Sequence, residues 1–303
     1  MVSAFMAQAR SANALARQWG RRAGRAQPFI LQEVESRMIA RAQIMRPVEG
    51  GVLHHGWLHP ASVSAVHNLF MDREMIALAP LPGVITLEVE AVSPVTALLN
   101  RFRNKPGKPQ IKSHEWLNQA AFPVPAESIG MVWSPLWLHA HPEPEQCLQH
   151  WNESLKPEGG LFFSVFGPDT LRELAPFAAL LGAELPQFPD MHDWGDLLGR
   201  QGFSDPVMEM ERITLTYQTP QTLLADCRAL FGNYLHNARP GLLGKRRHKA
   251  AMATLEDLRD PQNGRLNLTL ELVYGHAWKV RKNMSPKEVA VPLSSIGGRK
   301  PLK

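Results

Sequence analysis

The chain has 303 residues, of which 44% are hydrophobic and 20% charged, with a formal net charge of +5 and a sequence isoelectric point near 9.4. That length suffices for one large domain with a cap, or for two small domains, and for a sizeable core. No run approaches the ~20 apolar residues of a membrane-spanning helix, and the start lacks the apolar core of a secretory signal. We therefore expect no membrane segment. The positive charge suits nucleic acid, anionic lipid or an acidic protein partner.

Two features bear on the compartment. Cys147 and Cys227 lie far apart and fit neither a disulfide framework nor a zinc site, which favours a reducing compartment. Residues 1–28 are rich in arginine, and no acidic residue precedes Glu33. Such a start is typical either of a mitochondrial presequence or of a basic surface extension that leads into the domain. We expect the extension, and hence a cytoplasmic protein, with the mitochondrial matrix as the alternative.

The first regular elements are a helix and a strand. From Phe29 the apolar residues recur at helical spacing, which predicts a helix that ends before Pro47. Residues 52–60 (VLHHGWLHP) predict a short strand entering a turn, where a Rossmann-like domain has its glycine-rich loop, but Gly56 is the one glycine there. The histidines of this stretch could suggest a metal, yet no cysteine or nearby acid completes a ligand set. We expect no metal, and histidines that face solvent in a loop.

The middle of the chain is the least regular part. Residues 65–69 are interpreted as a second strand, residues 72–79 as a helix, and residues 84–92 as a third, alternating strand. Residues 100–114 are rich in lysine and arginine and predict a mobile basic insertion. Nucleic-acid binding there is disfavoured, because the aromatic residues of a base-stacking surface are almost absent.

Regular alternation returns at Gly130. Residues 131–134 predict a buried strand that ends in a loop, residues 145–155 a helix, residues 156–160 a turn, and residues 161–166 the next strand. Strands that alternate with helices favour a parallel sheet covered on both faces.

Two polar segments follow this strand. Thr170 to Glu173 has the pattern of a capping box, so Asp169 and Thr170 are either a structural cap or the rim of a pocket. Further on, Asp193 is expected to cap a helix over residues 194–201. His192, flanked by Asp190 and Asp193, is either polarised for general base catalysis or simply a hydrogen-bonded loop histidine.

The C-terminal part predicts two strands around a pair of helices. The strands are residues 208–217 and 266–279, and the helices are residues 220–231 and 245–258. The second helix begins with Lys245-Arg246-Arg247-His248-Lys249, which is either a solvated face or a docking site for an acidic carrier protein.

Several segments, taken in order, resemble one family: a strand that ends in Trp133-Ser134, then LKPEGGLFFSVFGPDTLREL, FPDMHDWGDLLGRQGFSDPVMEMERITLTY and LELVYGHAWKV. They resemble the malonyl-[acyl-carrier protein] O-methyltransferase family of biotin synthesis. A mitochondrial complex I assembly relative, described as an arginine hydroxylase, is similar over the same segments. The match runs roughly from Phe29 to Lys282 and is strongest from Lys156 onward.

The resemblance implies a class I S-adenosylmethionine-dependent methyltransferase. Its fold would be α/β and Rossmann-like, with a seven-stranded, mostly parallel sheet, helices on both faces and a helical cap. We expect this domain at residues 29–282, with the cap inserted at about residues 218–263, and a disordered basic tail at residues 283–303. The implied cofactor is S-adenosylmethionine. The implied partner is an acyl-carrier protein or another acidic protein, and the oligomeric state stays open.

The family's cofactor loop normally reads VLDLGCGTG, and this chain departs from it. Gly56 matches, His54 replaces the aspartate, and Leu58 and Pro60 replace glycines. The acid that should end the second strand falls near Phe70. With Ser134 after the fourth strand, the cofactor-binding candidates are Gly56, His54 and Ser134.

The acceptor half keeps its motifs. The resemblance makes His192 and Asp190 the catalytic candidates, and Asp169, Thr170, Asp193 and Tyr217 the substrate-pocket candidates. Two functions remain open. One is methylation of a malonyl-type carboxylate, a group that is already a nucleophile at neutral pH. The other is a degenerate methyltransferase-fold protein that works as a binding or assembly partner.

Overall fold

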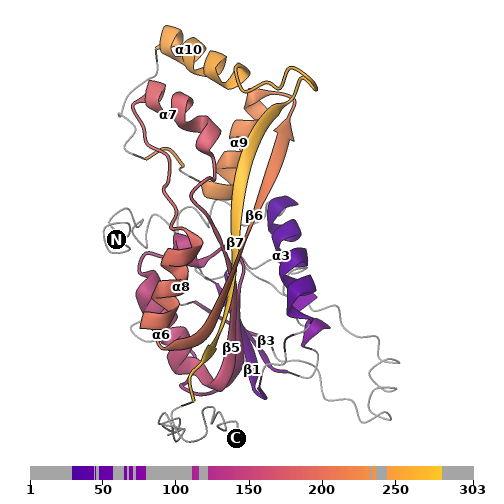
Figure 1. Ribbon diagram of the computed structural model, residues 1–303, viewed down its shortest axis with the longest axis vertical. Coiled ribbons are helices and arrows are strands. Elements are labelled where there is room, and N and C mark those ends of the chain that lie inside the picture. Colours follow the sequence, from indigo (N-terminus) through magenta and orange to yellow (C-terminus); the bar gives the residue numbers. More distant parts are fainter. Residues whose placement is uncertain are drawn as a thin grey trace, which may run out of the picture.

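A computed structural model describes residues 29–43, 45, 48–56, 65–66, 68–70, 73–79, 111–115, 122–232, 234–236 and 244–281. Its centre is a seven-stranded sheet with the strand order β3-β2-β1-β4-β5-β7-β6 (Figure 1). The strands are β1 (Gly51–His55), β2 (Met75–Ala79), β3 (Ile111–Glu115), β4 (Ile129–Ser134), β5 (Leu155–Phe166), β6 (Phe203–Tyr217) and β7 (Leu266–Lys279). β1 to β5 run parallel, and β7 is antiparallel to both β5 and β6. The mostly parallel seven-stranded sheet predicted by resemblance is confirmed.

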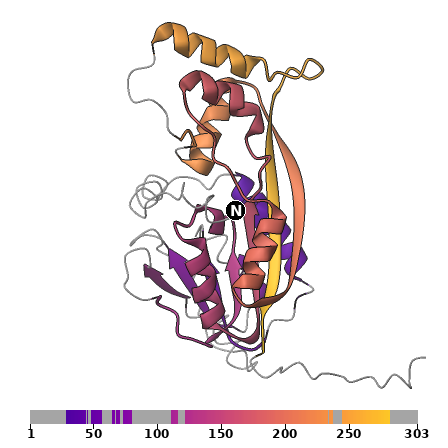
Figure 2. The same ribbon diagram turned by 60° about the vertical axis from the view of Figure 1, so that its left-hand side comes forward.

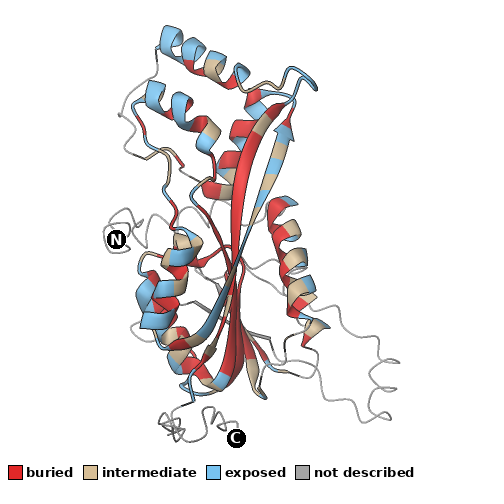
Figure 3. Cartoon of the chain, in the orientation of Figure 1, coloured by how far each residue is buried: buried red, intermediate tan, exposed pale blue. Residues whose placement is uncertain are grey.

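Helices cover the sheet on both faces. Helix α3 (Phe29–Ala42) lies on one face, and α6 (Pro144–Ser154) and α8 (Met191–Arg200) lie on the other (Figures 1 and 2). Side chains of β5 alternate between the two layers, so that Phe162 joins the hydrophobic core on the α3 side and Phe163 the core on the α6 and α8 side. Figure 3 shows β5 and β7 buried almost throughout, as expected for strands covered on both faces.

A helical cap lies beyond the carboxyl ends of the parallel strands (Figures 1 and 2). It contains the 3-10 turn η3 (Arg172–Leu174), α7 (Ala175–Leu181), α9 (Pro220–Phe231) and α10 (Lys245–Glu256). β5 ends where Phe166 pairs with Leu272, but the β6–β7 ladder continues for six more residues, to Tyr217 opposite Leu266. At 3.3 Å per residue this two-stranded ribbon reaches roughly 20 Å past the end of β5. It carries the cap away from the sheet.

The predicted elements between residues 65 and 115 are partly wrong. Residues 65–66 and 68–69 are helical rather than a strand, and the second strand is Met75–Ala79, where a helix was expected. Ile111–Glu115, at the end of the predicted basic insertion, forms the edge strand β3. Short apolar runs do not distinguish strand from helix by periodicity, which explains the exchange. The strand predicted at residues 84–92 lies outside the described residues.

The turn predicted at residues 156–160 is a bulge inside β5. Leu155 pairs with Ile129 and Gly160 with Met131, so five steps along β5 match two along β4. Glu158 has a positive φ of 64° in this excursion. A Cβ on Gly159 would lie 2.7 Å from the Lys156 carbonyl oxygen, so the tight bulge requires glycine there.

Three predictions about the ends and borders of the domain stay predictions. The basic extension at residues 1–28 and the tail at residues 283–303 lie outside the described residues, and the exact borders of the cap are not tested. Among the helices that the structure describes, none combines the length and the apolarity needed to cross a membrane.

Candidate functional site

The three cofactor-binding candidates meet at one edge of the sheet. β1 and β4 are adjacent parallel strands, and His54 pairs in register with Trp133. Ser134 therefore lies beside the last residue of β1, and Gly56 leaves the sheet at the same level. The structure brings these three positions together, and their role in binding a cofactor stays a prediction. All three residues are buried, however, so in this structure they do not line an open surface.

His54 makes a contact inside the protein. Its imidazole is fully buried, and its Nε2 lies 3.6 Å from Oε1 of Glu35, a buried residue of α3. The family's aspartate position is thus occupied by a side chain directed at a carboxylate of the covering helix. The expectation that these histidines face solvent is wrong for His54 and His55, because β1 lies in the interior of the sheet between β2 and β4.

The exits of β1 and β4 pack closely against each other. A Cβ on Gly56 would lie 3.0 Å from the Pro135 carbonyl oxygen and 3.2 Å from Cβ of Trp137. Leu136 adopts a positive φ of 44°, and its N–H donates to Ser164 Oγ at 3.1 Å. The Ser134 hydroxyl is buried and has no hydrogen-bond partner among the described residues. These features form a tight, strained turn at the position where methyltransferases approach their cofactor.

His55 belongs to an aromatic cluster on the other face of the sheet. Trp151 Nε1 donates to His55 Nδ1 at 2.8 Å, and Cys147 Sγ lies 4.0 Å from the same nitrogen. The Trp137 ring centroid is 5.5 Å away. Burial, aided by the nearby His141, holds the pKa of His55 well below its usual range, and burial lowers the pKa of His141 to about 3. Both imidazoles are therefore neutral parts of the core.

The segment after β5 fastens the strand end to the ribbon. Thr170 Oγ1 donates to the Glu271 carbonyl and accepts from the Glu271 N–H, both at 3.1 Å. The predicted capping box is wrong: Leu171 precedes η3 with a left-handed φ of 65° and no side chain caps the turn, while the Glu173 carboxylate accepts from Thr269. The backbone of β7 offers stronger partners than a local cap.

Asp169 is held by two guanidinium groups. Its Oδ2 lies 2.7 Å from Arg212 on β6 and 3.2 Å from Arg172 on η3. Arg212 Nε also lies 3.5 Å from the buried carboxylate of Glu271. A Cβ on Gly167 would come within 2.4 Å of Glu271 Oε1, so glycine lets this carboxylate lie over the end of β5. Asp169 therefore joins the end of β5 to the ribbon, and a role at a pocket rim stays a prediction.

The segment at Asp190 starts α8. Asp190 is the N-cap, since Oδ1 accepts from the N–H groups of His192 at 2.7 Å and Asp193 at 3.0 Å. The expectation that Asp193 caps a helix beginning at Trp194 is wrong, because the helix begins at Met191. The His192 side chain is exposed. Catalytic roles for His192 and Asp190, and a pocket role for Asp193, stay predictions.

Tyr217 lies apart from the other candidates. It ends β6 opposite Leu266, at the far end of the ribbon, and packs with the cap residues Leu223 and Cys227 in the α3-side core. Burial, with the nearby Asp226 carboxylate, raises the pKa of its phenol. The structure does not bring Tyr217 to the strand ends where Asp169 and Thr170 lie.

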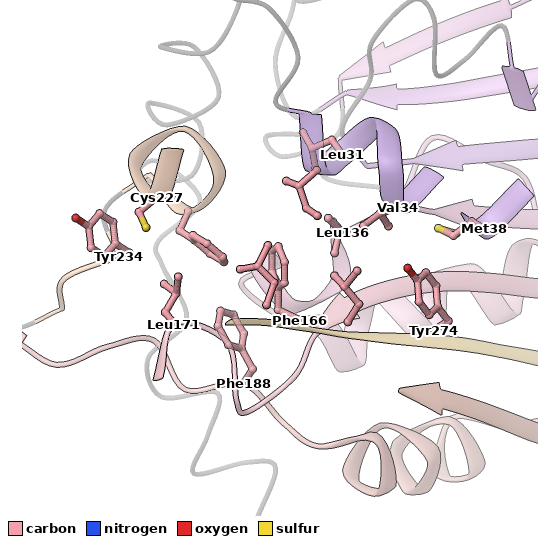
Figure 4. Close-up of a cluster of buried hydrophobic side chains, with 14 of the residues drawn as sticks. Leu31, Val34, Met38, Leu136, Phe166, Leu171, Phe188, Cys227, Tyr234 and Tyr274 are labelled. Carbon is pink, nitrogen blue, oxygen red and sulfur yellow. The ribbon is translucent and has the colours of Figure 1, made fainter. Parts of the chain in front are cut away.

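Sequence reasoning gave no role to His139, which lies between the sheet and the cap. It belongs to the 3-10 turn η2 (Leu138–Ala140) after β4, and its ring centroid is 4.9 Å from Phe166 and 5.5 Å from Phe188. Phe231 of α9 lies 4.7 Å from Phe166. Figure 4 shows Phe166 and Phe188 in the core that continues from α3 across the strand ends toward the cap. The sequence signal that could have identified His139 is its place in a loop directly after a buried strand.

The comparisons with known proteins now identify the family. No family model matches the chain. A malonyl-[acyl-carrier protein] O-methyltransferase of Laribacter hongkongensis is 33% identical over 254 residues, covering 82% of this chain and 82% of the relative. One of the same name from Nitrosospira multiformis is 33% identical over 265 residues, covering 84% of each. The chain belongs to the malonyl-[acyl-carrier protein] O-methyltransferase family.

Other similarities agree with this assignment. The Gallionella capsiferriformans member of the family is 41% identical over 181 residues, covering 58% of this chain and 61% of the relative. Among solved structures, the YcgJ protein of Bacillus subtilis superposes with a TM-score of 0.51 at 10% identity, covering 82% of this chain and 99% of YcgJ. A Bacillus halodurans protein proposed to be a methyltransferase gives 0.51 at 11% identity, with the same coverages. At such identities the structural likeness shows the fold alone.

The described residues of this family member do not fit S-adenosylmethionine in the manner its motif implies. The acid expected near Phe70 belongs at the end of β2, which is Ala79, and the chain beyond has no acidic residue before Glu88. At the end of β1 the motif's aspartate is His54, which is directed at Glu35. Among the described residues, the end of β2 thus lacks the carboxylate that would accept from the ribose hydroxyls.

Both thiols of this methyltransferase-family protein should be inert in the folded state. Cys147 and Cys227 are free and buried. Burial raises the pKa of Cys147 well above its usual range and that of Cys227 to about 12, which removes the reactive thiolate. Titration with a chromogenic disulfide at pH 8 is expected to show reaction only as fast as the protein unfolds, and rapid reaction of both thiols in denaturant. Immediate stoichiometric reaction of the native protein would contradict this.

Proposed function

We propose that this protein methylates the carboxylate of a malonyl group carried by an acyl-carrier protein, the reaction that the names of its relatives state. The observation that carries the proposal is the 33% identity over 82% of the chain to a named family member. The seven-stranded sheet order and its cap support it, because they provide the strand edge at which an open α/β sheet binds ligands.

The chain's own part in such a reaction would be positioning. A carboxylate acceptor is ionised at neutral pH and needs no general base, so alignment and exclusion of water supply most of the rate enhancement. The aromatic side chains of Phe166, Phe188 and Phe231 would exclude water from the strand edge. We propose that exposed His192, beside the Asp190 cap, and the predicted pocket residues Asp169, Thr170 and Asp193 lie on the acceptor side, whereas Tyr217 lies apart in the cap. A cytoplasmic location goes with this proposal, since the named relatives are bacterial.

A second candidate function is that of a binding or assembly partner that keeps the fold without the cofactor. Two observations favour it: the contact between His54 and Glu35, and the lack of an acid directly after β2. A cofactor is bound only by groups that face it. The candidate residues at the ends of β1 and β4 are buried, which favours a protein in which this edge of the sheet has become part of the core.

Calorimetric titration separates the two candidates. Purified full-length protein is titrated with S-adenosylmethionine and, separately, with S-adenosylhomocysteine, and a methyltransferase is expected to bind both with micromolar affinity. Absence of heat at ligand concentrations of about 1 mM, which corresponds to binding weaker than about −4 kcal/mol, would exclude the methyltransferase and support the partner protein. Transfer of labelled methyl to malonyl-acyl-carrier protein would then complete the assignment.

A further inference from the structure

The first half of α10 carries an unusual set of side chains. Its members are consecutive, basic and exposed, and we name them the α10 basic patch: Lys245, Arg246, Arg247, His248 and Lys249. The described residues place no carboxylate within salt-bridge distance of any of them. Several exposed or half-buried arginines elsewhere are paired with carboxylates, as Arg41 is with Glu209 and Arg212 with Asp169. The patch is therefore a concentrated positive charge that the described part of the chain does not neutralise.

The positive charge of the patch does not stabilise α10. Basic residues in the first turn oppose the helix dipole, and the first turn of α10 has no acidic residue and no side-chain cap. The acidic residues Glu256 and Asp257 lie at the opposite end. Acidic residues at the start of α10 and basic residues at its end would stabilise the helix better. Helix stability therefore does not explain why the basic residues lie at the start.

The helix that carries the patch is held in place at the outer end of the cap by packing and by a hydrogen bond. The second half of α10 packs into the core through Ala251 and Leu255, and Arg247 Nε donates to the Leu180 carbonyl of α7 at 2.6 Å. Figures 1 and 2 show α10 at the extreme end of the molecule, beyond α7 and α9. The positive charges are thus presented to solvent from a fixed helix.

We propose that the α10 basic patch docks the acidic surface of an acyl-carrier protein, an inference that rests on the proposed function. The patch spans about five residues, or roughly 7 Å of helix. Its charge ends before Glu256 and Asp257. A short positive patch beside negative charge complements a compact acidic helix better than a long phosphate backbone, which needs an extended basic stripe.

The side chains of the patch also distinguish it from other anion-binding surfaces. Residues 244–250 (GKRRHKA) contain no phenylalanine, tyrosine or tryptophan on which a nucleic-acid base could stack. They also lack the large apolar side chains with which an amphipathic helix enters a lipid surface. The docking point lies past the end of the roughly 20 Å ribbon, well away from the strand edge. This separation suits a partner that delivers its acyl group on a long flexible arm.

Binding of malonyl-acyl-carrier protein to immobilised full-length protein tests the proposal. The triple variant Lys245→Glu/Arg246→Glu/Lys249→Glu should weaken binding roughly ten-fold or more, since surface charge pairs are individually weak but act together here. The wild-type affinity should fall with added salt. Unfolding should not confound the result, because Lys245→Glu and Arg246→Glu place acids in the first turn of α10, where they favour the helix.

A matched control changes the same charge elsewhere. Arg200→Glu/Arg228→Glu/Arg265→Glu alters three exposed arginines outside the patch and should keep binding within about two-fold of wild type. Equal losses in both variants, no loss in the patch variant, or no binding by wild type overturns the proposal. Patch-dependent binding of single-stranded DNA or anionic vesicles in place of the carrier protein also overturns it. Docking without any methyl transfer leaves this inference standing and contradicts the proposed function alone.

Discussion

Lowering the pH from 7 to 4 is expected to remove about 3 kcal/mol from the free energy of unfolding through the buried His141 alone, and more through the buried His55, because both histidines resist protonation in the folded protein. Burial lowers the pKa of His55 well below 6.5 and that of His141 to about 3. The unfolded chain protonates both below pH 6.5, while the folded protein does not. Stability is therefore complete above that pH and is lost as the pH falls toward the folded pKa values. A loss of this size is a large fraction of the stability of many domains.

Urea unfolding at pH 7, 6, 5 and 4 measures this slope. Each histidine should contribute about 1.4 kcal/mol per pH unit. His141→Asn should lower the slope by that amount, because the asparagine oxygen can still accept the Glu143 N–H that His141 Nδ1 accepts at 2.9 Å. His192→Asn, at an exposed histidine, is the matched control and should leave the slope as in wild type. A free energy that is constant between pH 6 and 4 would show that the buried imidazoles protonate without unfolding.

The sequence predicted the C-terminal half of the sheet well. Residues 161–166 and 266–279 are strands, as expected, since the first is a short apolar run and the second alternates apolar with other residues. The family resemblance added the seven-stranded, mostly parallel sheet and the cap. Local patterns sufficed here because burial, periodicity and length all favour the same structure.

Local patterns failed where a tertiary contact decided the outcome. Thr170 and Glu173 have the spacing of a capping box, yet both bind the backbone of β7, about a hundred residues further along the chain. The polar pair His54-His55 suggested a loop, but its strand lies inside the sheet and buries both rings. β3 is an edge strand of five residues, and its mostly polar sequence, IKSHE, hid the strand among the basic residues of the predicted insertion.

Sequence reasoning predicted the position of the candidate site at the strand ends better than it predicted the surroundings of its residues. Gly56 and Ser134 do meet at the ends of adjacent strands, because parallel strands present their carboxyl ends at one edge. Burial of these positions followed from the packing of Gly56 against Pro135 and Trp137, which no spacing rule contains.

Restoring the family's aspartate by His54→Asp is expected to destabilise the protein by about 3 kcal/mol or more, rather than to rebuild a cofactor site. The new carboxylate would replace a buried imidazole whose Nε2 lies 3.6 Å from the buried Glu35 carboxylate. Two carboxylates would then share one buried site, where like charges repel each other strongly. Urea unfolding at pH 7 measures the loss, and calorimetry with S-adenosylmethionine should show no gain in affinity.

A second substitution tests the cause of that loss. Glu35→Gln in the His54→Asp background removes the like-charge repulsion and should recover about 1–2 kcal/mol, as coupled neighbours do in a double-mutant cycle. His192→Asp, which adds the same charge in the exposed first turn of α8, should change stability by less than about 0.5 kcal/mol. If His54→Asp leaves stability unchanged and strengthens cofactor binding, position 54 still faces the cofactor, and the proposed conversion of this edge into core is wrong. If His54→Asp destabilises the protein and Glu35→Gln restores part of the lost stability, then His54 is held by its contact with α3. The packing of the fold itself then requires the residue that replaces the motif's aspartate.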